Sequence, residues 1–168
     1  MSPITIFKIL TYLLIPVAIL FGLMDIIMLF MALANPAILL IVFALACFVM
    51  YTFTSLRFLL EGIVNNQHCK SSLKDWIKVN AYVTLFLFIM FFMNSAATFF
   101  IDDITLRQTL SEMMDQQPEL AGKISLDFFI KIFHVVSGIM FVISSLIIIH
   151  VLMNFKFLKR YQDLFSKE

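Results

Sequence analysis

Residues 9–56 read ILTYLLIPVAILFGLMDIIMLFMALANPAILLIVFALACFVMYTFTSL, and Asp25 is the only charged side chain among them. A helix needs roughly 20 apolar residues to cross a hydrocarbon core that is about 30 Å thick. The stretch is therefore long enough for two passes. Asn35-Pro36 divides it, because Asn-Pro favours a turn and proline is tolerated in the first turn of the following helix. The sequence predicts two spanning helices here, at about 6–33 and 36–61.

Two further charge-free stretches lie later in the chain, at 79–101 and at 132–155 when histidine is counted as neutral. Each is long enough for one spanning helix, and we expect these helices at about 75–101 and 128–155. Spanning β-strands are excluded, because the runs are too long and do not alternate between apolar and polar residues. The predicted fold is an all-α membrane protein, a four-transmembrane-helix up-down bundle that forms a single integral membrane domain over residues 1–168.

The composition agrees with this class. Hydrophobic residues make up 62% of the chain and charged residues 14%, whereas soluble domains have about 45–50% and about 25%. A water-soluble globule is therefore excluded, and 20 Phe residues argue against disorder. A net charge of +1 argues against a nucleic-acid partner recognised through bulk electrostatics.

The first residues resemble a signal peptide, because Lys8 precedes an apolar stretch and Ala32-Leu33-Ala34 is a small-residue cleavage pattern. The apolar stretch is more than 20 residues long, however, and a cleavable core has about 7–15. It also contains Pro16 and Asp25. We expect the first helix to be retained.

The distribution of Lys and Arg predicts the orientation, because cytoplasmic loops of membrane proteins are enriched in them. With a cytoplasmic N-terminus, nine of the 12 basic residues lie on the inner side: Lys8, Arg57, Lys70, Lys74, Lys78, Lys156, Lys159, Arg160 and Lys167. The outer side carries Arg107, Lys123 and Lys131 together with Asp102, Asp103, Glu112, Asp115, Glu119 and Asp127. We expect a multi-pass protein of the cell inner membrane, with both termini cytoplasmic.

The connections differ in length. The long outer loop at 102–127 is the most polar segment, and apolar residues alternate with charges in it: Ile104, Leu106, Leu110, Met113 and Met114. This pattern predicts a short amphipathic helix on the outer surface, ending at Gln117-Pro118. Ser72-Leu-Lys-Asp75 resembles a capping box at the start of the third helix. Tyr51 and Trp76 are expected at the inner interface, as aromatic anchors.

Asp25 is the most informative residue, because an intramembrane carboxylate costs about 2.5–3.5 kcal/mol on insertion scales. Counting at 1.5 Å per residue places it roughly 12 Å below the outer end of its helix. Four other polar residues fall at similar depths and complete a candidate polar layer with it: Asn94, Ser95, His134 and Ser137. The layer is either interhelical glue that fixes the helix register or a proton or cation site with His134 as the partner of Asp25. Both interpretations stay open at this point.

The remaining His and Cys residues do not suggest a metal or redox centre. His134 and His150 are 16 residues apart on one helix, about 24 Å of rise, so they cannot share a haem or a metal ion. Cys47 and Cys69 are expected at different depths and cannot pair. His68-Cys69 is too small a group for zinc and is expected to be a solvated loop. We expect no metal, no cofactor and no catalytic residues.

Two patterns indicate packing or docking. Arg57 and Glu61 are four residues apart at the inner end of the second helix and can form an ion pair on one face. This pair is either an interfacial salt bridge or part of a docking site for anionic lipid or a cytoplasmic partner. Ala18 and Gly22 form a small-residue pair that permits close helix packing, inside the bundle or in an oligomer.

The sequence favours a small non-enzymatic membrane protein that acts through oligomerisation or as an accessory subunit of a membrane complex. Its expected partners are the lipid bilayer and either further copies of itself or another membrane protein. The alternative is a small proton-coupled transporter or channel centred on Asp25. A lipid-modifying enzyme is disfavoured, because the chain shows only scattered acid, base and nucleophile groups.

Overall fold

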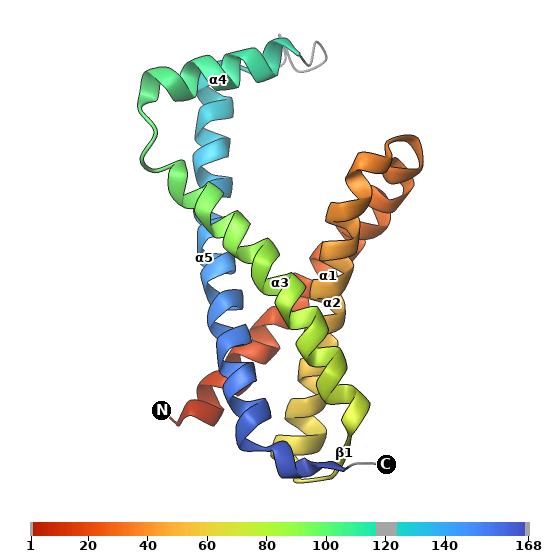
Figure 1. The fold of residues 1–168 in the computed structure, drawn as a ribbon. Helices are drawn as coiled ribbons and strands as arrows, with labels where there is room; N and C mark the ends of the chain where they lie inside the picture. The colour runs from red at the N-terminus through yellow and green to blue at the C-terminus, as the bar shows by residue number, and fades with distance from the viewer. Residues whose placement is uncertain (1, 117–123, 167–168) are drawn as a thin grey trace. The chain divides into compact units, whose positions relative to one another are not determined.

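The computed structural model describes residues 2–116 and 124–166, and nearly all of them are helical (Figure 1). The long helices are α1 (Pro3–Ala34), α2 (Leu39–Arg57), α3 (Ser71–Ala97) and α5 (Leu126–Arg160), with the shorter α4 at Asp103–Asp115. The turn Pro36–Ile38 precedes α2, and the π-helical segment Phe58–Val64 follows it. Short strands β1 (Cys69–Lys70) and β2 (Phe165–Ser166) pair in parallel, and the turn Gln162–Leu164 precedes β2.

Four helical segments of the described chain are long and apolar enough to cross a membrane: Pro3–Ala34, Pro36–Val64, Ser71–Ala97 and Leu126–Arg160. This confirms the prediction of an all-helical protein with four candidate spans. The chain divides into two compact units. Unit 1 comprises residues 1–88 and 146–168, and unit 2 comprises residues 89–145. The expected single domain stays a prediction.

The hairpin between α1 and α2 turns where the Asn-Pro pair predicts it. The Asn35 side chain accepts a hydrogen bond from the Ala37 amide at 3.2 Å, and Pro36 opens the turn. At the other end of α1, Ser2 Oγ accepts from the Thr5 amide at 3.2 Å, and Pro3 occupies the first helical position. Both ends of α1 are therefore set by local sequence signals.

The core of unit 1 follows a seam along α1 whose members are spaced alternately four and three residues apart. Buried members of this seam are Phe7, Thr11, Leu14, Ala18, Phe21 and Ala32. Farther along, the ring of Phe21 lies edge-on to Phe48 of α2 and to Phe88 of α3, with centroid distances of 5.7 and 6.0 Å. The rings of Phe48 and Phe88 lie 4.8 Å apart. Such edge-to-face contacts fix ring positions as well as filling space.

The Ala18 and Gly22 pair lies on α1. Ala18 is fully buried. A Cβ added at Gly22 would lie 3.5 Å from Cγ2 of Val49 on α2, an ordinary van der Waals distance. Gly22 therefore faces α2, and the use of the pair in the bundle or in an oligomer stays a prediction.

At the far end of unit 1, the strand pair β1–β2 joins the segment after α2 to the segment after α5. Phe58 stacks on Phe165, with centroids 5.4 Å apart, and Cys69 is buried. Two expectations were wrong here. Because α3 already begins at Ser71, Ser72 lies inside its first turn and is not an N-cap. Cys69 does not lie in a solvated loop, although His68 beside it is exposed.

Unit 2 contains α4 and the adjoining parts of α3 and α5. Asp102 caps α4 by accepting hydrogen bonds from the amides of Ile104 and Thr105. It also accepts one from the Thr105 hydroxyl, which is the main reason why the pKa of Asp102 lies below its usual value. Leu106 and Leu110 are buried. Arg107 pairs with Asp127 at 2.8 Å. Gln117-Pro118, where the helix was expected to end, lies outside the described residues, and α4 itself ends at Asp115.

Candidate functional site

A polar network lies in the core of unit 1, where α1, α2 and α5 meet. Its five residues are fully buried: Thr11, Tyr51, Ser55, His150 and Asn154. His150 is central, with Nε2 at 2.9 Å from Thr11 Oγ1 and Nδ1 at 2.8 Å from Tyr51 Oη. Asn154 Nδ2 donates to Ser55 Oγ at 2.8 Å and to Tyr51 Oη at 3.2 Å.

The hydrogen bond from Thr11 to the backbone of α1 sets the direction of the other hydrogen bonds in the network. The Thr11 hydroxyl donates to the carbonyl oxygen of Phe7 at 2.8 Å, so its oxygen accepts from His150 Nε2–H. A neutral imidazole carries one N–H, so Nδ1 accepts from the Tyr51 hydroxyl. Asn154 then donates to Tyr51, and all bonds in the chain run in the same sense. Such chains strengthen cooperatively in a low dielectric.

The network is enclosed on every side. The Phe7 ring stacks on the imidazole of His150, with centroids 4.8 Å apart and planes within 8°. The Oδ1 atom of Asn154 is buried and has no hydrogen-bond partner among the described residues. All five side chains are buried, and their hydrogen bonds join α1, α2 and α5 inside unit 1. Tyr51 is therefore not the interfacial anchor that the sequence suggested.

The sequence interpretation missed this network, although a signal was present. Tyr51 and Ser55 are four residues apart on α2, and His150 and Asn154 are four apart on α5. Residues at this spacing lie on one helix face. In an alternating bundle the second and fourth spanning helices run in the same direction, so these polar pairs can meet in register.

Asp25 occupies the α1 seam between Phe21 and Ala32 and is half-buried. Its Oδ1 atom is covered, and it has no hydrogen-bond partner among the described residues. The neighbouring Met24, Ile26 and Ile27 are exposed and apolar. An intramembrane carboxyl group with these surroundings is costly unless it hydrogen-bonds to a partner group or is protonated.

The other four residues of the expected polar layer belong to unit 2. Asn94 is exposed, whereas Ser95 and Ser137 are buried. His134 is half-buried, and its Nδ1 lies 3.0 Å from the carbonyl oxygen of Ile130 in the same helix. Asp25 belongs to unit 1, so the layer stays a prediction.

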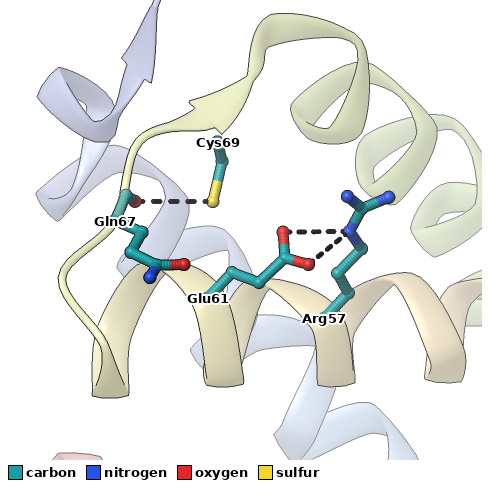
Figure 2. Close-up of polar contacts among 4 residues, drawn as sticks. All are labelled: Arg57, Glu61, Gln67 and Cys69. Carbon is teal, nitrogen blue, oxygen red and sulfur yellow. Dashed lines mark hydrogen bonds and ion pairs between the residues drawn. The ribbon is translucent and has the colours of Figure 1, made fainter.

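Arg57 and Glu61 lie close together at the end of unit 1 (Figure 2). Arg57 Nε–H donates to both carboxylate oxygens of Glu61 at 2.9 Å. Cys69 Sγ lies 3.8 Å from the carbonyl oxygen of Gln67. Burial raises the pKa of the Cys69 thiol, the Glu61 carboxylate raises it further, and Arg57 opposes them. The thiol is therefore kept protonated and unreactive at neutral pH.

Within residues 2–116 and 124–166, no group of three or more His, Cys, Asp and Glu side chains is placed to hold a metal ion. Comparison of the chain with protein-family models, with curated proteins and with solved structures found no match.

Proposed function

We propose that this chain is a non-enzymatic integral membrane protein that acts by association, as a homo-oligomer or as an accessory subunit of a membrane complex. The observation that carries the proposal is the carboxyl group of Asp25. Its Oδ1 atom is covered and has no hydrogen-bond partner among the described residues, while the side chain as a whole stays half-exposed on α1. A helix of a second polypeptide would reach the carboxyl group from its exposed side and hydrogen-bond to it there.

The energetics favour such a contact. A polar hydrogen bond between helices in a membrane contributes about 0.6–2 kcal/mol. Tyr51, Ser55 and Asn154 already hydrogen-bond to one another inside unit 1. Asp25 is the acidic side chain of α1, and we assign the contact with an external partner to it because its Oδ1 atom has no hydrogen-bond partner among the described residues.

The location follows the charge distribution. We propose a multi-pass protein of the cell inner membrane with both termini cytoplasmic, because nine of the 12 Lys and Arg residues then lie inside. A phosphatase or fluorescent reporter fused after Glu168 should behave as cytoplasmic, and a tag at Gln116 should be reached by an impermeant reagent from outside. Labelling of the two positions in the opposite sense would overturn the orientation.

A second function is favoured by the same carboxyl group. A half-buried acid without a partner in a spanning helix is a typical proton site of transporters. In that alternative Asp25 binds and releases a proton during coupled transport, and His134 is a candidate partner. The two functions differ in what they require of residue 25, namely a hydrogen-bonding group for association and a titratable group for transport.

The test uses donor- and acceptor-labelled copies of the full chain in lipid vesicles, with energy transfer between them as the measure of assembly. Asp25→Leu should weaken association about tenfold, equivalent to about 1.4 kcal/mol. Asp25→Asn should retain most of it. Native mass spectrometry of nanodiscs made directly from cell membranes tests the accessory-subunit form of the proposal. A second polypeptide should be detected in complex with the wild-type chain. It should be absent from the Asp25→Leu variant.

Thr84→Val on α3 of unit 1 is the matched control, because Thr84 Oγ1 is also buried and has no hydrogen-bond partner within residues 2–116 and 124–166. It should not change association. A wild-type chain that is monomeric in both experiments would contradict the association proposal. A pH-dependent flux in vesicles that Asp25→Asn abolishes would establish the transport alternative in its place.

A further inference from the structure

A pocket of about 430 Å³ lies at the end of unit 1 between the last turn of α2 and the first turns of α3. Arg57 and Lys70 supply its positive charge, and Thr54 and Ser72 supply hydroxyl groups. The rest of its wall is apolar: Phe53, Leu73 and Trp76. The pocket thus combines a cationic end with an aromatic wall at the level where two candidate spans reach the membrane surface.

The cationic groups are placed to take an anion. The two hydrogen bonds between Arg57 and Glu61 both use Nε of the guanidinium group, and Figure 2 draws none from its two terminal nitrogens. A planar guanidinium group with its terminal N–H groups available suits a phosphate. Lys70 is exposed. It immediately precedes α3, so the positive end of that helix dipole lies at the same rim.

The apolar side of the pocket continues along the same pair of helices. Trp76 and Ser72 also line a groove of about 280 Å³ that includes Asp75 and Val79. Farther along, α2 and α3 enclose an apolar groove of about 500 Å³, whose walls include Phe43, Ala44, Val83 and Phe86. Trp76, Val79, Val83 and Phe86 recur at helical spacing and share one face of α3. From Trp76 to Phe86 this face is about 15 Å long, which accommodates much of an acyl chain.

We propose that this surface binds an anionic glycerophospholipid, with its phosphodiester at Arg57 and Lys70 and one acyl chain along the α2–α3 groove. A soluble anion would use the cations but leave the aromatic wall and the groove unoccupied. A zwitterionic lipid would bring its own cation next to Arg57 and Lys70. The carboxylate of Asp75, in the adjoining groove, is an acceptor for a head-group hydroxyl and disfavours a second negative charge. The site is independent of the association proposed above.

The protein carries its own probe, because Trp76 is the only tryptophan of the chain. The full chain is placed in phosphatidylcholine vesicles that contain a small fraction of brominated phosphatidylglycerol or brominated phosphatidylcholine. Bromine quenches indole fluorescence at contact, so the quenching reports which lipid occupies the groove. We expect phosphatidylglycerol to quench Trp76 severalfold more strongly than phosphatidylcholine at the same mole fraction.

Charge-removing variants distinguish lipid binding at this pocket from a general effect of positive surface charge. Arg57→Gln with Lys70→Gln should abolish the preference for phosphatidylglycerol, and Lys70→Gln alone should reduce it. Lys156→Gln with Lys159→Gln removes the same charge from exposed positions near the end of α5 and should leave the preference unchanged. Unchanged helical circular dichroism in unbrominated vesicles shows that the double variants remain folded.

Three results would overturn the proposal. Equal quenching by the two lipids in the wild type would show that the surface does not select an anionic lipid. An equal loss of preference in both double variants would assign the effect to surface charge in general. Relief of quenching by inorganic phosphate, but not by chloride at the same ionic strength, would assign the cations to a soluble anion.

Discussion

Replacing His150 with alanine should lower the free energy of unfolding by about 3–5 kcal/mol, in the range of large-to-small changes in packed cores. The substitution removes the ring that stacks on Phe7 and leaves a cavity at a fully buried position. It also leaves the Tyr51 hydroxyl without its acceptor, and a buried unsatisfied group costs about 1–3 kcal/mol. The measurement is reversible unfolding of the full chain in mixed micelles, followed by circular dichroism.

His134 provides the control for this prediction, because it lies on the same helix but is half-buried, and its ring nitrogen Nδ1 lies within hydrogen-bond distance of a backbone carbonyl of its own helix. His134→Ala should change the free energy of unfolding by less than about 1 kcal/mol. Tyr51→Phe should have an intermediate effect of about 1–3 kcal/mol, since the ring stays and only the hydroxyl is lost. Equal effects of the two histidine variants would refute the structural role assigned to the network.

The second large effect is expected at Phe48, whose ring is fully buried against Phe21 and Phe88. Phe48→Ala should destabilise the protein by about 2–4 kcal/mol. This is less than the about 3–5 kcal/mol typical of soluble proteins, because the unfolded helix in lipid keeps its phenyl ring in an apolar solvent and loses mainly packing contacts. The same unfolding experiment measures it.

Phe43 on the same helix is the comparison, because its ring is 59% exposed. Phe43→Ala should cost less than about 1 kcal/mol, since lipid replaces the few contacts that are lost. Similar losses at Phe43 and Phe48 would mean that the aromatic cluster does not hold unit 1 together.

The long helices and the hairpin turn were predictable because lipid imposes them. A spanning segment must satisfy its own backbone hydrogen bonds and be apolar, so charge-free runs reveal helices. Asn35-Pro36 then identifies the turn, as observed. The end of the last helix was less predictable. The charge-free run stops at Phe155, but α5 continues to Arg160, and Phe157 and Leu158 in that extension are buried.

The network was not predicted from the sequence for another reason. His150 was considered only as a possible haem or metal ligand, and Tyr51 was interpreted as an aromatic anchor. The packed face of α1 was hidden for a different reason. In lipid both faces of a helix are apolar, so hydrophobic periodicity no longer marks the face that packs inward. The alternating spacing from Phe7 to Phe21 emerges only once burial is known.

Depth in the membrane, which grouped Asp25 with Asn94, Ser95, His134 and Ser137, is only one coordinate of each residue. Whether two side chains meet also depends on the rotation of each helix about its axis, which apolar sequence leaves undefined. The Arg57 and Glu61 pair was easier, because both residues lie on one helix and their spacing alone sets their distance.

The hydrogen-bond chain through His150 also constrains biosynthesis. A ribosome delivers α1 and α2 to the membrane well before α5, so an unfinished chain contains Tyr51 without the imidazole that accepts its hydrogen bond and Ser55 without the amide of Asn154. The early hairpin can insert, but its polar groups find their native partners only after the last helix has been translated. Completion of the bundle is therefore a late step, and a chain stalled before α5 would display unmatched polar groups within the bilayer.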